Sequence, residues 1–167
     1  IRRLRGSHLV FPGWRFPLAQ AITLFHPQDG RGIYALPWQG VTLIGTTDLD
    51  DATPDNREPA ADPAEAAYLL EAVNHWSPGL GLKVEEAISS FCGLRPVIDT
   101  GRDRPEKEAR DHLIEWQQGL MTVAGGKLTT FGLMAGQALK TLAARIGPPR
   151  NQFQPANIPE GSSTKTV

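Results

Sequence analysis

The sequence predicts an α+β fold, in which a mostly antiparallel sheet of about six or seven strands is covered by two helices. Short apolar segments separated by turn residues recur at close spacing, which is typical of antiparallel strands. Two longer segments place their apolar residues at helical intervals. The length of 167 residues suits one domain, and 40% hydrophobic with 21% charged residues is ordinary for a globular protein.

Four strands are predicted before Asp50, because Gly- and Pro-containing turns divide this part of the chain into short apolar segments. The predicted strands are Leu4–Phe11, Ala19–His26, Gly32–Pro37 and Val41–Asp48. The last two are expected to pair as a hairpin around Gln39-Gly40, and all four to form an antiparallel meander. Residues 50–61 are polar and contain proline, so they are predicted to be a loop.

The first helix has a clear start signal. Asp62 suits the N-cap, Pro63 the first helical position, and Glu65 lies three residues after the cap, as in a capping box. Apolar residues then follow at helical spacing and are expected to face the sheet: Ala66, Leu69, Leu70, Val73 and Trp76. Ser77-Pro78-Gly79 is expected to end the helix.

The second half of the chain predicts a long strand, a hairpin and a second helix. The strand covers residues 84–96, and a charged loop follows at 99–108. Residues 112–116 and 120–124 are expected to pair around a Gln-Gln-Gly turn, and residues 128–146 to form a helix that ends at Gly147. Residues 150–167 are polar and rich in Pro, Ser and Thr, which predicts a disordered tail.

Composition excludes several classes of function. With 17 basic and 18 acidic residues, the chain lacks the basic excess typical of non-specific nucleic-acid binding. A single cysteine, Cys92, excludes an internal disulfide framework and fits a reducing compartment. The histidines lack metal-ligand spacing, so no metal site is predicted. The start is charged without an apolar run behind it, so no signal peptide is predicted. Because the sequence opens directly on a patterned segment, it is expected to be a piece of a longer protein.

The segment from Gly125 to Phe131 is the strongest candidate for a binding site. It runs from a short apolar segment through two glycines, Lys127 and two threonines into a helix. A helix start presents unpaired N–H groups and the positive end of the helix dipole, and Lys127 adds a positive charge beside them. The sequence therefore predicts that a group that is anionic, or becomes so during a reaction, binds there.

Three further residues stand out on neighbouring strands. His8 lies within an apolar strand, Arg95 follows a Gly-Leu pair and precedes a proline, and Arg110 precedes a predicted strand. With Lys127 they would suit an anionic substrate, since arginine binds phosphate oxygens in a bidentate fork. Each also has a structural reading: His8 as a satisfied strand histidine, and either arginine as the partner of a nearby aspartate. Likewise, Gly45-Thr46-Thr47-Asp48 can be read as a strand that ends in a turn.

Taken in order, these segments resemble the FAD-dependent glycerol-3-phosphate dehydrogenases of the D-amino-acid-oxidase-like flavoprotein superfamily. The resemblance covers Arg5 to about Ile146, and its matching motifs are Arg5-Gly6-Ser7-His8, Pro37-Trp38, Ile44-Gly45-Thr46-Thr47-Asp48, Tyr68-Leu69-Leu70, Gly93-Leu94-Arg95-Pro96, Arg110-Asp111-His112 and Gly125 through Phe131. It implies that residues 1–149 form the substrate-binding domain with a returning FAD-contact segment. The N-terminal dinucleotide fingerprint and the helical C-terminal domain of the family are absent from the sequence, so the chain alone is not expected to retain FAD.

The resemblance also implies roles for individual residues. Arg95 and Arg110 would bind the phosphate of glycerol 3-phosphate. Lys127 would bind its other oxygens, and His8 would act near the C2 hydroxyl, which makes His8 and Lys127 the catalytic candidates. The flavin would lie against the helix entry, at Gly125, Gly126, Lys127, Leu128 and Thr129. The implied reaction passes a hydride from C2 to flavin N5 and gives dihydroxyacetone phosphate.

The same resemblance implies that the full-length enzyme passes electrons to a quinone. It would be cytoplasmic, with any peripheral contact to the inner membrane made by other regions. One departure is Gly132, which stands where the family usually has arginine, and this puts FAD affinity in question. Two alternatives stay open: a related flavin oxidoreductase that acts on another hydroxy or amino acid, and a catalytically silent binding domain.

Overall fold

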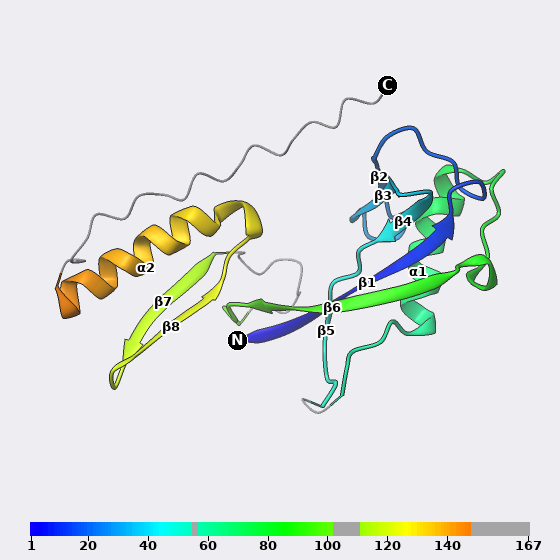
Figure 1. Cartoon of the computed structure of the whole chain (residues 1–167). Helices are drawn as coiled ribbons and strands as arrows, with labels where there is room; N and C mark the ends of the chain where they lie inside the picture. Colours follow the sequence, from blue (N-terminus) through cyan, green and yellow to red (C-terminus); the bar gives the residue numbers. More distant parts are fainter. Residues whose placement is uncertain (55–56, 102–110, 148–167) are drawn as a thin grey trace, which may run out of the picture.

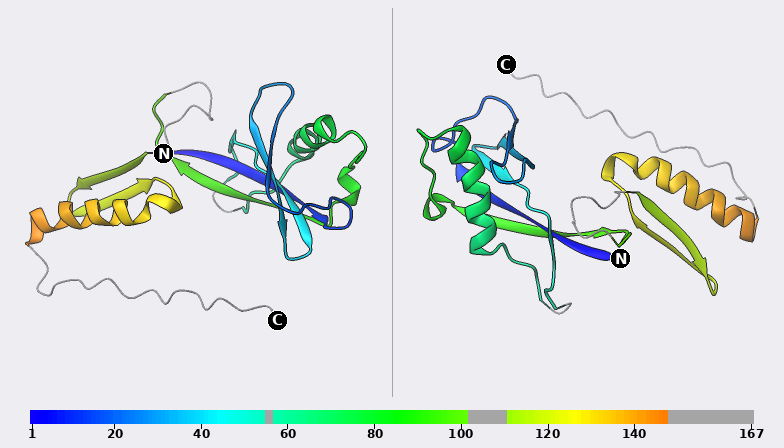
Figure 2. Two further views of the ribbon diagram at one scale, coloured as in Figure 1. Left: turned by 90° about the horizontal axis from the view of Figure 1, so that it is seen from above. Right: turned by 180° about the vertical axis from the view of Figure 1, so that it is seen from behind.

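The computed structural model describes residues 1–54, 57–101 and 111–147. They form a six-stranded sheet with one helix packed on it, and a two-stranded hairpin with a second helix (Figure 1, Figure 2). The predicted α+β class, with mostly antiparallel sheets and two helices, is confirmed. The strands divide into two sheets, however, because within the described residues β7 (His112–Gln117) and β8 (Leu120–Gly125) pair with each other and not with the larger sheet.

The larger sheet is built around its longest strand. Its members are β1 (Arg2–Pro12), β2 (Ile22–Phe25), β3 (Gly32–Trp38), β4 (Val41–Gly45), β5 (Leu49–Asp50) and β6 (Ser89–Val97). The order is β2-β3-β4-β1-β5, and β6 also pairs with β1. The expected meander of four consecutive strands is therefore wrong for β1, which lies beside β4 and not beside β2. With 11 residues, β1 is long enough to pair with β4 at one end and with β5 at the other.

Several strand boundaries differ from the prediction. β2 begins at Ile22 rather than Ala19. β4 ends at Gly45 rather than Asp48. The strand expected from Val84 begins only at Ser89, because Val84–Glu86 form a short 3₁₀ helix, η1. β5 was not predicted, and its second residue begins the predicted loop; its pairing with Leu4 and Arg5 is a long-range contact that no local pattern marks.

Both hairpin turns follow from a Gln-Gly pair. Gln39 and Gly40 join β3 to β4, and Gln118 and Gly119 join β7 to β8. All four residues have positive φ. Two consecutive left-handed residues match the right-handed twist of the strands, and glycine at the second position keeps the strain low. The two predicted hairpins are confirmed.

Helix α1 (Pro63–Trp76) begins with the predicted capping box. The Asp62 side chain accepts the Glu65 N–H, and the Glu65 side chain accepts the Asp62 N–H. Apolar residues of α1 pack into the core against β1, β3 and β4, among them Ala66, Leu69, Leu70 and Val73. Trp76 was expected on this face, but its side chain lies at the last turn and is 55% exposed.

Successive residues of β1 serve opposite faces of the sheet. Leu9 and Phe11 point into the core beneath α1. Gly6 and His8 belong to the other face, since side chains alternate along a strand. Among the helices of the described residues, α1 alone makes extensive contact with β1. The face that carries His8 is therefore the open one.

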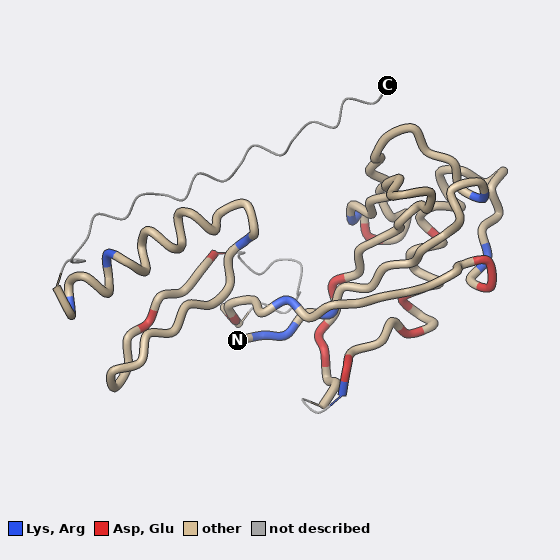
Figure 3. The backbone as a smooth tube through the Cα atoms, viewed as in Figure 1, with Lys and Arg blue, Asp and Glu red and all other residues tan. Residues whose placement is uncertain are grey.

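A buried polar cluster joins β1 to the start of α1. The Thr47 hydroxyl accepts the Ser7 N–H at 2.8 Å and donates to Glu65 at 2.6 Å. Arg5 Nε lies 3.1 Å from the other Glu65 oxygen, and its Nη2 donates to Asp62 at 3.0 Å. Figure 3 shows the Arg residues at the start of β1 beside the acidic residues of β5 and the loop that follows it. A buried carboxylate such as Glu65 is tolerated only when it is paired in this way.

The second helical segment packs less closely. It begins as a 3₁₀ turn, η3 (Leu128–Thr130), and continues as α2 (Phe131–Ile146), which contacts β7. No residue of α2 is buried among the described residues. Within the described residues, neither α1 nor α2 is long and apolar enough to cross a membrane.

We predict that Thr47→Val lowers the free energy of unfolding of the chain by about 2–3 kcal/mol, because it leaves the Ser7 N–H and a Glu65 oxygen without partners. Urea unfolding measures the change. Thr23→Val is the matched control, because Thr23 is exposed on β2, and it should change stability by less than about 0.5 kcal/mol. Equal effects of the two substitutions would contradict a structural role for the buried hydroxyl.

Candidate active site

His8 lies on the open face of the larger sheet, between two neighbouring strands. Its cross-strand partners are Phe91 on β6 and Gly45 on β4. The imidazole stacks on the Phe91 ring, with centroids 4.6 Å apart and planes 4° from parallel. Its Nδ1 is buried and has no hydrogen-bond partner among the described residues. Burial, and secondly the positive charge of Arg95, hold the pKa of His8 below its ordinary value of 6.5. The ring is therefore neutral at pH 7.

Arg95 reaches across the same face from β6. Its Nη1 donates to Asp48 Oδ1 at 3.0 Å and to the Thr47 carbonyl at 3.1 Å, and its Nη2 donates to Thr46 Oγ1 at 2.7 Å. Asp48 is 3% exposed, so this ion pair is largely shielded from water. The Arg95 Nε has no partner among the described residues, and 29% of the side chain is exposed. Arg95 can therefore still donate to a ligand.

The glycine pair after β8 adopts a backbone conformation that favours glycine. Gly125 and Gly126 have φ of +77° and +78°, a conformation that L side chains rarely adopt. The Gly126 N–H donates to the Asp111 carbonyl at 2.8 Å. A Cβ at Gly126 would also collide with Met134. Glycine is thus required at this point by conformation and by space.

The predicted row of unpaired N–H groups is shorter than expected. Besides the bond made by Gly126, the Lys127 N–H donates to Thr130 Oγ1 at 3.1 Å. Within the described ranges, the N–H groups of Leu128 and Thr129 have no partner and stay available at the start of η3. The Leu128 side chain is 88% exposed, which is unusual for an apolar residue.

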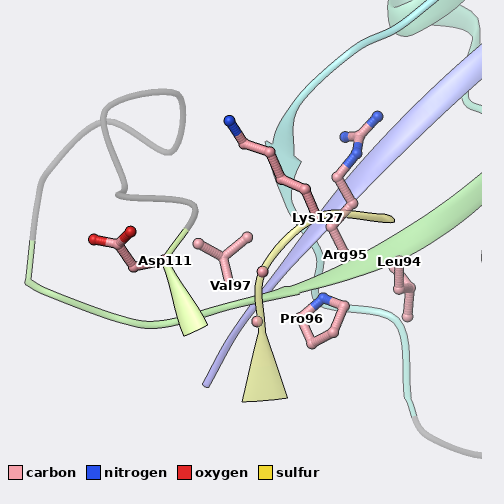
Figure 4. Close-up of a pocket in the computed structure, with 8 residues that line it drawn as sticks. Leu94, Arg95, Pro96, Val97, Asp111 and Lys127 are labelled. Carbon is pink, nitrogen blue, oxygen red and sulfur yellow. The ribbon is translucent and has the colours of Figure 1, made fainter. Parts of the chain in front are cut away.

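Arg95 and Lys127 meet at one pocket. It has a volume of about 230 Å³ and is lined by Leu94, Arg95, Pro96, Val97, Asp111, Gly125, Gly126 and Lys127. Figure 4 shows the Lys127 and Arg95 side chains extending to the same side, while Asp111 points away from them. The two longest cations of the site thus reach toward a common space, which would attract an anionic ligand.

Three of the four predicted substrate residues lie in one region. Lys127 shares the pocket with Arg95, and His8 is near enough to Arg95 for the charge of Arg95 to lower the His8 pKa. Arg110 lies outside the described residues, as does the predicted tail at 150–167. The described part of the chain contains no cluster of three or more His, Cys, Asp or Glu side chains placed to hold a metal ion.

Sequence reasoning missed Thr46, Asp48 and Phe91. The first two were read as the end of a strand, yet they hold the guanidinium of Arg95. Phe91 packs on the His8 ring. A hydroxyl and a carboxylate placed directly after a strand as apolar as β4 were a usable signal. The stacking on Phe91 had no such signal, because it depends on the β1–β6 register.

Comparisons with known proteins give consistent results. Residues 1–142 match the protein family described as FAD dependent oxidoreductase (DAO). The chain is 36% identical over 147 residues to a protein named aerobic glycerol-3-phosphate dehydrogenase from Staphylococcus haemolyticus, which covers 87% of this chain and 26% of that protein. A protein of the same name from Staphylococcus aureus (strain USA300) is 34% identical over 149 residues.

A solved structure gives the same result in three dimensions. The X-ray structure of the glycerol-3-phosphate dehydrogenase from Bacillus halodurans, complexed with FAD, matches with a TM-score of 0.71 at 35% identity. The match covers 86% of this chain and 27% of that one. The chain therefore spans only a minor part of the length of these relatives.

We predict that His8 titrates below 6.5 and that Arg95→Gln raises its pKa, because the substitution removes a positive charge that disfavours the imidazolium. NMR titration of histidine-labelled chain measures this, with the resonance assigned by His8→Asn. Arg15→Gln is the control, since Arg15 pairs with Glu86 instead. An unchanged His8 pKa in Arg95→Gln would contradict the arrangement.

Proposed function

We propose that this chain forms the substrate-binding part of a glycerol-3-phosphate dehydrogenase. The premise is that the chain belongs to the FAD-dependent oxidoreductase family. The supporting observation is that Arg95 and Lys127 line one pocket beside the glycine loop, with a neutral His8 on the same sheet face as Arg95. The chain spans 26% of the length of the curated relatives, so the activity is proposed for a longer protein that contains it.

The helix entry fits the flavin of FAD. Gly125 and Gly126 hold the main chain there in the left-handed conformation. The N–H groups of Leu128 and Thr129 are unpartnered among the described residues. With Lys127 and the positive end of the helix dipole, these groups would stabilise negative charge on a ring placed against them. When bound, FAD would supply the hydride acceptor. A flavin bound at this position would also bury part of the exposed Leu128 side chain.

Substrate binding is assigned to the cations. Arg95 keeps donor capacity at Nε after its bonds to Thr46, Thr47 and Asp48. We assign the phosphate of glycerol 3-phosphate to Arg95 and Arg110, and the remaining substrate oxygens to Lys127. Because Asp48 and Thr46 fix the guanidinium before a ligand arrives, little side-chain freedom is lost on binding.

His8 is assigned as the base. Its lowered pKa keeps the ring neutral at pH 7, so a ring nitrogen can accept the proton of the C2 hydroxyl. Loss of that proton and of the C2 hydride converts glycerol 3-phosphate to dihydroxyacetone phosphate. Lys127 would hold the oxygen from which the proton leaves, and its charge would stabilise the negative charge that develops on this oxygen as the proton is lost.

Gly132 bears on how firmly FAD is held. A Cβ at this position would meet no atom within 4 Å, so a side chain could begin there without a collision. Glycine in the first turn of α2 costs helix stability of about 1 kcal/mol relative to alanine, and it supplies no cation. This supports keeping the catalytically silent domain as the second candidate. A quinone acceptor and a cytoplasmic location with peripheral membrane contact stay predictions.

We predict that the full-length protein, reconstituted with FAD, oxidises glycerol 3-phosphate. Arg110→Ala and Lys127→Ala should each lower kcat/KM by about 10- to 100-fold, the effect of losing a charged hydrogen bond. Dye-linked turnover measures this, with the exposed Lys140→Ala as control. Unchanged turnover in Arg110→Ala would remove its phosphate role. Oxidation of another hydroxy or amino acid would favour a related oxidoreductase, and failure to take up flavin a silent domain.

We predict that the 167-residue chain alone purifies without flavin. Its pocket of about 230 Å³ is smaller than the roughly 300–1,000 Å³ of typical small-molecule sites. The absorbance spectrum of the purified chain measures flavin content, and the reconstituted full-length protein is the control. A yellow chain with stoichiometric flavin would contradict the prediction.

A further inference from the structure

Two side chains of the candidate site lie directly over glycines of the larger sheet. The guanidinium of Arg95 lies over Gly6, and the ring of His8 lies over Gly45. Gly6 is on β1 and Gly45 ends β4, next to the Thr46–Asp48 segment that binds Arg95. Neither glycine has a role in the site so far.

At Gly6 the missing side chain makes room for the guanidinium. A Cβ there would lie 2.5 Å from Arg95 Cζ and would also overlap both terminal nitrogens. A guanidinium is the far end of a flexible side chain, so it can move away at small cost to the fold. Such a movement would, however, pull Nη1 and Nη2 from their bonds of 3.0 Å to Asp48 and 2.7 Å to Thr46.

At Gly45 the missing side chain makes room for the imidazole. A Cβ there would lie 2.7 Å from both Cγ and Nε2 of His8 and would overlap Cδ2. Phe91 occupies the opposite side of the ring, with parallel planes. The ring is therefore held between a side chain on β6 and a bare backbone on β4, and an added methyl group would tilt it out of this arrangement.

A positive φ does not explain these glycines. Gly6 and Gly45 lack the positive φ that makes glycine necessary at Gly125 and Gly126. Two other glycines of the larger sheet lack such close neighbours: a Cβ at Gly32 would meet the Thr23 methyl at an ordinary 3.5 Å, and one at Gly93 would meet nothing within 4 Å. Gly6 and Gly45 are thus distinguished by the site side chains that lie over them.

We propose that Gly6 and Gly45 are positioning residues, which set the place of the Arg95 guanidinium and of the His8 ring over the open face of the sheet. The inference rests on the proposed function, because it assigns Arg95 to the phosphate and His8 to the proton. Gly6 then governs substrate affinity, and Gly45 governs the chemical step.

The test uses the full-length, FAD-loaded protein with Gly6→Ala, Gly45→Ala and the control Gly32→Ala. Gly6→Ala should raise KM for glycerol 3-phosphate about tenfold with a smaller change in kcat, as expected when one charged contact weakens. Gly45→Ala should lower kcat about 100-fold, the lower part of the range for a positioned acid–base group. Gly32→Ala should leave both constants unchanged. Equal losses in all three variants would overturn the proposal.

Double-mutant cycles separate positioning from a general loss of structure. Gly6→Ala should have no further effect when Arg95→Ala is already present, and Gly45→Ala none when His8→Asn is present. Additive losses would mean that the glycines act on the fold, and would overturn the proposal. Urea unfolding of each variant identifies one that fails to fold. Replacing the side chain that lies over that glycine, by Arg95→Ala or His8→Asn, should then restore folding, and a double variant that stays unfolded would overturn the proposal.

A further measurement is independent of the substrate. The NMR titration of His8 in the full-length protein should give a different pKa in Gly45→Ala and the wild-type pKa in Gly32→Ala, because only the first moves the ring from its buried place. If the protein fails to oxidise glycerol 3-phosphate but His8 responds in this way, the proposed function is wrong and the positioning stands. If turnover occurs and His8 does not respond, the positioning is wrong.

Discussion

One buried contact joins the elements on which the larger sheet and α1 depend. In this contact the Glu65 carboxylate is bound by the Thr47 hydroxyl and by the Arg5 guanidinium. Glu65 closes the capping box of α1, Arg5 belongs to the central strand, and Thr47 lies between the two residues that bind Arg95. A carboxylate that is 1% exposed must keep all its partners, because a buried unpaired charge costs several kcal/mol. The start of α1, the register of β1 and the place of Arg95 are therefore coupled.

The candidate site is built on this support from side chains on rigid strands and from one glycine-rich turn. Asp48 balances the charge of Arg95 and fixes its orientation, yet leaves Nε free to donate among the described residues. His8 is kept neutral by burial and by the nearby positive charge. Both effects act before any ligand binds, which is how a preorganised site lowers the entropy lost on binding. The site is incomplete in the described residues, where Leu128 and much of α2 lie exposed.

Local rules account for most of what the sequence could predict. The Asp62–Glu65 capping box and the two Gln-Gly turns are each set by a few neighbouring residues, and these predictions are confirmed. The family was also correctly identified from motifs spread over the chain. Local rules could not predict the central place of β1, the pairing of β5 or the contact of Arg95 with Thr46, because these join residues 29 or more positions apart. The roles of His8, Arg95, Arg110 and Lys127 stay predictions.

The two-faced character of β1 makes this strand tolerant of some changes and intolerant of others. Odd-numbered residues from Arg5 to Phe11 serve the helix side, and Gly6 and His8 serve the opposite side. Inserting or deleting one residue between them would exchange the two sets, so that Leu9 would enter the ligand space and the imidazole the apolar core. Evolution and protein engineering can therefore vary the chemistry of β1 by substitution, while changes of chain length must be confined to segments outside the paired strands and their tight turns.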